Sequence, residues 1–241
     1  ESTGEMWIKG TPAVYADSTR RLISSEIFYN EKTKQLSTIG GGRISEGSTV
    51  LEYDHLTNND LTGIGRAEGH VLLRDTVSDY GIRAEFLDRK KATDAFVAYG
   101  DTTYFFSIID GDTLFIAADT LEMWNQTDTV ANDTVRMMRA YHHVRLFKSD
   151  MQGRTDSLIF NGRDSMFHFF GRPVLWSDTT QFSADSISMT LENKKIHEIV
   201  LTQQALIISE LLKTYYDQIK GKKIIAEFDS SEVRNMLVLG N

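Results

Sequence analysis

Apolar and polar residues alternate along most of this chain in short runs that polar turns separate. Residues 112–209 show the pattern most clearly, because three similar segments follow one another: DTLFIAADTLEMW, TDSLIFNGRDSMFHFFGRPVLWS and SDTTQFSADSISMTLENKKIHEIVLTQQALIIS. Each begins with Asp and a hydroxyl residue, continues with an apolar run, and reaches a second Asp at Asp119, Asp164 or Asp185. Short alternating runs indicate strands with one buried face. Self-similarity at a period of a few tens of residues indicates stacked repeats.

The N-terminal half carries the same pattern in a less regular form. Strand-like segments follow one another from Ser18, with polar turns at residues 31–34 and 57–60. Over the whole chain we count seven units of two strands, or about fourteen strands. The last unit reaches Gly240 where the other copies would enter their closing strand. We therefore predict one all-β domain over residues 1–241, and expect the natural protein to continue beyond them.

Two segments leave their local structure open. Residues 125–134 form the largest insertion and are rich in polar turn formers, so we expect either a long loop or an extended hairpin. Residues 209–221 place apolar side chains at roughly helical spacing, with Gly221 as a candidate C-cap. The alternative for this segment is a loop that leads into a strand. We favour a loop or a short helical turn.

Composition excludes several classes of protein. The formal net charge is −8 and the basic residues are scattered, which disfavours nucleic-acid binding because that function needs a basic patch. No apolar run reaches the length of about 18 residues that a membrane-spanning helix needs. The chain holds no cysteine, so disulfides, thiolate nucleophiles and cysteine-ligated zinc are excluded.

The sequence offers no distinct catalytic or metal-binding constellation. His142 and His143 are the only adjacent histidines, and neighbouring strand residues point to opposite faces, so we expect no shared metal ion. Gly40-Gly41-Gly42 lacks the Lys-Ser/Thr and the helix of a phosphate-binding loop, and we interpret it as a bulge or tight bend. The repeated Asp-Thr and Asp-Ser pairs are interpreted as turn residues. We expect no enzyme, no catalytic residue and no cofactor, with a carbohydrate-active or carbohydrate-binding repeat protein as the alternative.

The repeated unit resembles the OstA-like (LptA) family. Its form is Ala or Gly, Asp, alternating apolar residues, a basic or Asn-containing turn, and a closing strand of the type Gly-x-Val. The resemblance covers residues 18–241 and is closest at residues 172–209, which look like OstA-like proteins of Bacteroidetes-type bacteria. The closing glycine is present at Gly69 and Gly171. Two units depart from the pattern, with His142-His143 and Gln204-Ala205 in its place.

This resemblance implies an open β-jellyroll, or β-taco, in the periplasm, with any signal peptide removed and an association with the outer membrane as a further expectation. It implies a repeat protein of lipopolysaccharide transport and outer-membrane biogenesis. Such a protein shields the acyl chains of lipopolysaccharide or lipid A in an apolar groove and bridges inner- and outer-membrane components. The open edges of the sheet would pair with other jellyroll domains, or with a second copy in a head-to-tail homo-oligomer.

The candidate lipid-binding residues are the alternating apolar residues of the predicted strands. They are Ile27, Tyr29, Leu51, Tyr53, Val71, Leu73, Phe86, Phe106, Leu121, Met123, Val144, Met166, Phe170, Trp176, Ile187, Met189, Leu206 and Ile208. For each aromatic residue, packing in a closed core is the alternative to contact with an acyl chain.

Overall fold

The computed structural model describes residues 4–109, 111–128, 133–212, 215–229 and 232–240, and this part of the chain is almost entirely antiparallel β-structure. One short 3-10 helix, η1, spans Lys91–Thr93. The strands are β1 (Glu5–Ala16), β2 (Arg20–Asn30), β3 (Gln35–Ile39), β4 (Gly42–Glu46), β5 (Thr49–Tyr53), β6 (His55–Asn59), β7 (Ile64–Asp75), β8 (Tyr80–Lys90), β9 (Ala95–Tyr99), β10 (Tyr104–Ile109), β11 (Asp112–Ala117), β12 (Thr120–Asp128), β13 (Asp133–Lys148), β14 (Met151–Asn161), β15 (Met166–Phe170), β16 (Val174–Ser177), β17 (Thr180–Ser183), β18 (Ser186–Glu192), β19 (Lys195–Leu212), β20 (Tyr215–Asp229) and β21 (Glu232–Leu239). The predicted all-β class is confirmed.

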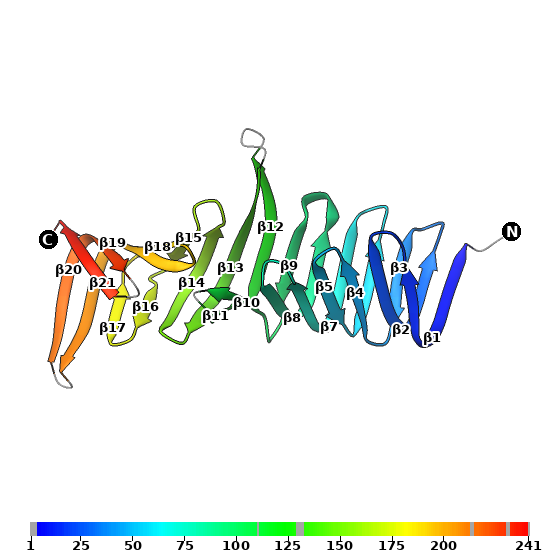
Figure 1. Cartoon of the computed structure of the whole chain (residues 1–241), viewed down its shortest axis with the longest axis horizontal. Helices are drawn as coiled ribbons and strands as arrows, with labels where there is room; N and C mark the ends of the chain where they lie inside the picture. Colours follow the sequence, from blue (N-terminus) through cyan, green and yellow to red (C-terminus); the bar gives the residue numbers. More distant parts are fainter. Residues whose placement is uncertain (1–3, 110, 129–132, 213–214, 230–231, 241) are drawn as a thin grey trace. The chain divides into compact units, whose positions relative to one another are not determined.

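Figure 1 shows the strands in the order of the chain. The chain divides into two compact units. Unit 1 comprises Glu1–Ser107 and Thr120–Trp124, and unit 2 comprises Ile108–Asp119 and Asn125–Asn241. In each unit, long strands pair with each other, and a long strand also pairs with two short strands. In unit 1, β7 pairs with β8 on one side and with β5 and β6 on the other. In unit 2, β14 pairs with β13 and with both β15 and β16.

This alternation of long strands with broken ones is how the chain builds a jellyroll from stacked repeats. Each short pair is one strand broken at a bend, so 21 strands are described where the sequence predicts about fourteen. The bend at Gly40-Gly41, between β3 and β4, is the one that the glycine run predicts, and Gly40 has a φ of +77°. The predicted β-jellyroll class is therefore confirmed.

The long strands bend at two consecutive residues with left-handed backbone. These pairs are Gly69-His70 in β7, His142-His143 in β13 and Gln203-Gln204 in β19. Opposite each pair, the backbone N–H of an aspartate donates to a carbonyl of the bend, from Asp54 to Gly69 (3.0 Å), from Asp119 to His142 (3.2 Å) and from Asp185 to Gln203 (2.9 Å). The aspartates thus hold the bends, as the turn interpretation predicts. His142 and Gln203 occupy the same structural position as Gly69, so the second departure from Gly-x-Val begins at Gln203, one residue before the Gln204-Ala205 that the sequence alignment gave.

The core consists of apolar rows that run across the strands on one face of the sheet. In unit 2, one row joins Ala140, Leu158, Phe169, Ile187, Leu201 and Ile224, all at most 1% exposed. In unit 1, a comparable row joins Leu22, Ile44, Leu51, Leu73 and Ile82. Burial of one such side chain contributes about 1.5–3 kcal/mol, so these rows dominate the stability of each unit.

Two local predictions have a clear outcome. The loop or helical turn favoured for residues 209–221 is wrong, because β19 and β20 pair there, with Ser209 opposite Asp217 and Glu210 opposite Tyr216. The ladder of backbone hydrogen bonds outweighs the helical spacing of the apolar residues. For the insertion at residues 125–134, the described part belongs to β12 and β13, which Arg136 joins by donating from Nε to Oδ1 of Asn125 at 2.7 Å. Residues 129–132, 213 and 214 lie outside the described residues.

Candidate functional site

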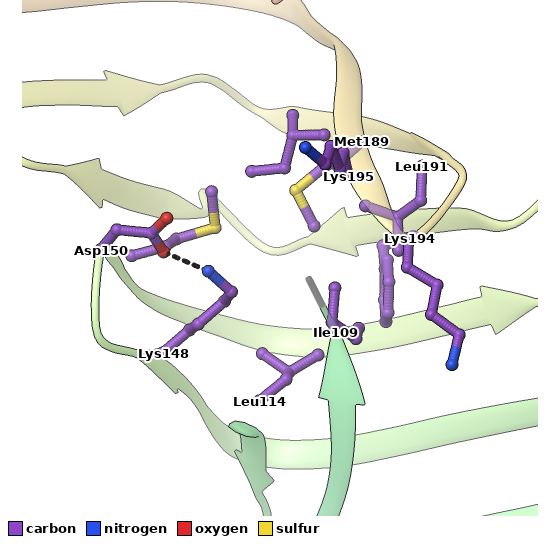
Figure 2. A pocket seen from close by; sticks show the side chains of 11 residues that line it. Ile109, Leu114, Lys148, Asp150, Met189, Leu191, Lys194 and Lys195 are labelled. Atoms are coloured by element: carbon purple, nitrogen blue, oxygen red, sulfur yellow. Dashed lines mark hydrogen bonds and ion pairs between the residues drawn. The ribbon is translucent and has the colours of Figure 1, made fainter. Parts of the chain in front are cut away.

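A pocket opens in unit 2 over the buried face of the sheet (Figure 2). Its volume is about 390 Å³, counted with the space that is open to solvent. The lining residues are Ile109, Leu114, Lys148, Asp150, Met151, Phe167, Met189, Leu191, Lys194, Lys195 and Ile196. Seven of these eleven side chains are apolar, so the pocket can receive an apolar group.

The floor of the pocket belongs to one cross-strand row of the core. Phe167 in β15 lies opposite Phe160 in β14 on one side and Met189 in β18 on the other. The rings of Phe160 and Phe167 are 4.6 Å apart between centroids, and Phe167 and Met189 are each 3% exposed. Leu114 from β11 is equally buried. The floor is therefore a packed apolar surface that the alternation of the strands creates.

Cationic side chains occupy the mouth of the pocket. Lys148 lies on one side, and its Nζ is 2.8 Å from Oδ1 of Asp150 and 3.9 Å from Oδ2 of Asp112. The Asp112 carboxylate also accepts from the backbone N–H of Ser149, and hydrogen bonds from Ser149 are the main cause that lowers the pKa of Asp112. These contacts hold the turn between β13 and β14 in place and leave only 13% of the Lys148 side chain exposed.

Lys194 and Lys195 also line the pocket, and in Figure 2 Lys195 lies beside Met189 whereas the ammonium of Lys194 points away from Lys195. Lys194 belongs to the tight turn between β18 and β19, in which Asn193 and Lys194 both have positive φ, at 52° and 63°, and Lys195 is the first residue of β19. Glu192 pairs with Lys195 directly across this turn. Two-residue turns with left-handed backbone join antiparallel strands with little distortion, so the hairpin itself determines where the two lysines lie.

Eleven of the eighteen candidate lipid-binding residues lie on the buried face. Nine of them are at most 3% exposed: Ile27, Tyr53, Val71, Leu73, Leu121, Met123, Val144, Ile187 and Met189. Tyr29 and Leu51 are half-buried, and each lies opposite a buried or half-buried apolar residue, Leu36 and Ile44 respectively. Of all eighteen, only Met189 lines the pocket in unit 2.

The other seven candidates lie on the outer face of the sheet. They are Phe86, Phe106, Met166, Phe170, Trp176, Leu206 and Ile208. In β15 the buried residues are Phe167 and Phe169, and in the part of β19 that follows the bend they are Ala205 and Ile207. An assignment that is one residue out of phase exchanges the two faces of a strand, and the bend at Gln203-Gln204 interrupts the alternation. Contact of these residues with lipid stays a prediction.

The outer-face aromatic residues have polar neighbours. Phe86 stacks on Tyr99 with ring centroids 5.2 Å apart, and the Tyr99 hydroxyl accepts from Arg66. The Trp176 indole N–H donates to Oε1 of Gln181 at 3.1 Å. The guanidinium of Arg154 lies 5.7 Å from the Trp176 ring. These contacts provide a structural role for residues that the sequence places among the lipid-contacting set.

Sequence reasoning missed most of the pocket. Leu114 and Phe167 were identifiable from correct phasing of the alternation. Lys148, Lys194 and Lys195 lie at turns, and only the fold brings the two turns to one pocket. The short turn Asn193-Lys194 between two apolar runs was the available signal.

The described residues provide no constellation typical of catalysis. They contain no group of three or more His, Asp or Glu side chains that could hold a metal ion. His142 and His143 face separate aspartates, with His143 Nδ1 2.8 Å from Asp119 and His142 Nδ1 3.8 Å from Asp156. Burial raises the pKa of the Tyr53 hydroxyl, which lies inside unit 1. Among the described residues, no helix has the length and the hydropathy needed to span a membrane.

Comparison with known proteins finds a likeness among solved structures alone. No protein-family model matches the chain, and no curated protein does. Among solved structures, the chain is similar to LptH from Pseudomonas aeruginosa, described as the LptA-homologous periplasmic component of the conserved lipopolysaccharide transport device. The TM-score is 0.41 and the sequence identity 9%, over 51% of this chain and 82% of LptH.

Proposed function

We propose that this chain is a non-catalytic lipid-binding protein of the periplasm that shields acyl chains of lipopolysaccharide or lipid A during transport toward the outer membrane. The observation that carries the proposal is the pocket of unit 2, whose floor belongs to the apolar core row of Phe167 and Met189. An acyl chain that enters this pocket exchanges water for packed apolar side chains. The repeated unit and its resemblance to OstA-like proteins support the same function.

The energetics explain why transport across an aqueous compartment needs such a protein. Transfer of one CH₂ group out of water contributes about 0.8 kcal/mol, so a chain of about twelve carbons exposed to water costs on the order of 10 kcal/mol. The pocket provides part of that shelter. Stacked repeats can extend an apolar surface by one strand at a time, which suits ligands with several acyl chains.

The edge strands support the proposed pairing with other jellyroll domains. β1 pairs with β2, and β21 with β20, each along one side. Both strands expose large apolar side chains, including Trp7 at 50% in β1 and Leu237 at 54% in β21. An exposed apolar edge strand is a template for another strand. We propose that these edges bind other components of a transport bridge, or a second copy of this chain.

The test is site-specific photo-crosslinking with lipopolysaccharide. A photoreactive residue in place of Met189 in the pocket should capture lipopolysaccharide, whereas one in place of Ile208 on the outer face should not. Both positions lie in unit 2 and in paired strands, so the comparison isolates the face of the sheet. Equal capture at both positions, or capture only at Ile208, would contradict binding in the pocket.

A further inference from the structure

The outer face of unit 2 carries a row of aromatic and amide side chains on β13, β14, β16 and β17. In order across these neighbouring strands, the row consists of Phe147, Gln152, Trp176 and Gln181, each directly opposite the next. Phe147 is 53% exposed. One strand separates Phe147 from Trp176, so the two rings are about 10 Å apart. Aromatic rings therefore alternate with amides along one row of this face.

The ring of Trp176 is held from both sides. Its indole N–H donates to Oε1 of Gln181 at 3.1 Å, and the guanidinium of Arg154 lies 5.7 Å from the ring. Within the part of the chain that the structure describes, the Nε2 group of Gln181 and the side-chain amide of Gln152 make no hydrogen bond. An amide can both donate and accept. The row thus offers a fixed aromatic ring beside amide groups that a polar ligand can reach.

Two arginines lie directly beside this row. Arg145 in β13 and Arg154 in β14 are opposite each other, and Arg145 is two residues along the strand from Phe147. Both arginines are exposed, and neither guanidinium forms an ion pair with a carboxylate of the described residues. The carboxylate of Asp156, two residues beyond Arg154, faces His142 at 3.8 Å. Like charges directly opposite each other destabilise a sheet, so this pair costs stability unless an anion binds it.

An opposed acidic pair in the same unit shows the contrast. Glu198 lies opposite Glu227, and Nδ2 of Asn235 donates to Oε2 of Glu227 at 3.0 Å. The acidic pair therefore has a donor within the chain. The partner that balances the arginine pair has to come from outside these described residues, and it has to be an anion.

We propose that this face of unit 2 binds an oligosaccharide that carries carboxylate groups, with sugar rings on Phe147 and Trp176 and one carboxylate between Arg145 and Arg154. The C–H groups on one side of a sugar ring pack against the negative face of an aromatic ring. The sugar hydroxyl groups reach the amides, and a guanidinium binds a carboxylate through two parallel hydrogen bonds. One sugar ring is smaller than the separation of the two aromatic rings, about 10 Å, so we expect at least two sugar units to bind.

The place of the site in the sheet favours a sugar over a peptide. Recognition of an extended peptide uses the free backbone groups of an edge strand, whereas β13, β14, β16 and β17 are each paired on both sides. A ligand on this face therefore meets side chains alone. The buried residues of the same strands, such as Leu146 and Leu175, point to the opposite face, where the pocket lies. The proposed site is thus separate from acyl binding, and it gives the carbohydrate-binding alternative a place on the molecule.

The experiment titrates the full chain with trigalacturonate and with neutral maltotriose in a calorimeter. We expect trigalacturonate to bind about fivefold more tightly, and Arg145→Gln/Arg154→Gln to lose about this factor, from two exposed charge contacts. Phe147→Ser should lose about threefold, from one ring contact. Arg145→Gln alone should not lower the melting temperature, because it removes a repulsion and keeps the contact of Arg154 with Trp176.

The matched control is Lys222→Gln/Arg234→Gln, which removes the same charge from exposed positions of unit 2. Screening of distant charges should keep its effect on the affinity below about twofold. Equal losses in the two double variants, equal binding of the two sugars, or no binding of trigalacturonate by the unmodified chain would overturn the inference. Displacement of a fluorescent acyl probe by trigalacturonate would overturn it as well, because the pocket lies on the other face. Failure of the acyl probe itself to bind would contradict the proposed function alone.

Discussion

The bend of β7 predicts a large cost for the substitution Gly69→Ala. Gly69 has a φ of +72°, and a residue with a Cβ costs about 1–2 kcal/mol in this left-handed conformation. An added Cβ would also lie 2.9 Å from the Cβ of Asp54 and still closer to its Oδ2. Asp54 would have to move, which breaks its contact of 2.6 Å with Nδ1 of His70. We expect the free energy of unfolding of unit 1 to fall by about 2–3 kcal/mol in total.

Gly47→Ala is the control for the backbone contribution. Gly47 also has a positive φ, of +57°, but nothing lies within 4 Å of an added Cβ. This variant should cost about 1 kcal/mol, and the difference from Gly69→Ala measures the collision with Asp54. Urea unfolding followed by circular dichroism gives both values, and both positions lie in unit 1. Equal losses for the two variants would refute the view that Asp54 and Gly69 form one tightly packed bend.

Two further predictions concern an ion pair and an edge. Hydrogen bonds from Arg66 are the main cause that lowers the pKa of Asp88, so Asp88→Asn should cost about 0.5–1 kcal/mol at pH 7 for this partly exposed pair. A lowered pKa in the folded state stabilises the fold at pH values above the ordinary pKa of about 3.9, and this stabilisation disappears as the pH falls through the pKa of the folded state. The free energies of unfolding of the unmodified chain and of Asp88→Asn should therefore converge in acid. A difference that stays constant with pH would contradict the pairing. Leu237→Lys on β21 should weaken concentration-dependent association in light scattering, whereas Val77→Lys, 79% exposed in a turn, should not; equal effects would contradict edge pairing.

The repeated alternation of the sequence was sufficient to predict the class of the fold. Asp119 and Asp185 recur before alternating runs, and the structure places both opposite equivalent bends. The left-handed pair at His142-His143 could not be predicted with the same ease, because neither residue is the glycine that favours positive φ. The geometry of neighbouring strands imposes that conformation, and a pattern of residue types does not record it.

The faces of the strands were harder to predict than the strands themselves. Side chains alternate between the two faces of a strand with a period of two. One residue added or removed at a bend therefore moves every following side chain to the opposite face. Ile187 and Met189 were placed correctly because no bend interrupts β18 between them. Leu206 and Ile208 were placed on the wrong face because they follow directly after the bend at Gln203-Gln204.

The same reasoning separates the two chemical halves of the candidate site. The apolar floor at Phe167 and Met189 follows from alternation, and any stacked β-repeat would produce a comparable row. The cationic mouth does not follow from the repeat, because Lys148 and Lys195 belong to turns that are far apart in sequence and come together only through strand pairing. The apolar surface is thus a property of the repeat, whereas the charge at the mouth depends on individual turns. Substitutions at the turn of β18 and β19 should accordingly change the charge of the pocket mouth without disturbing the fold.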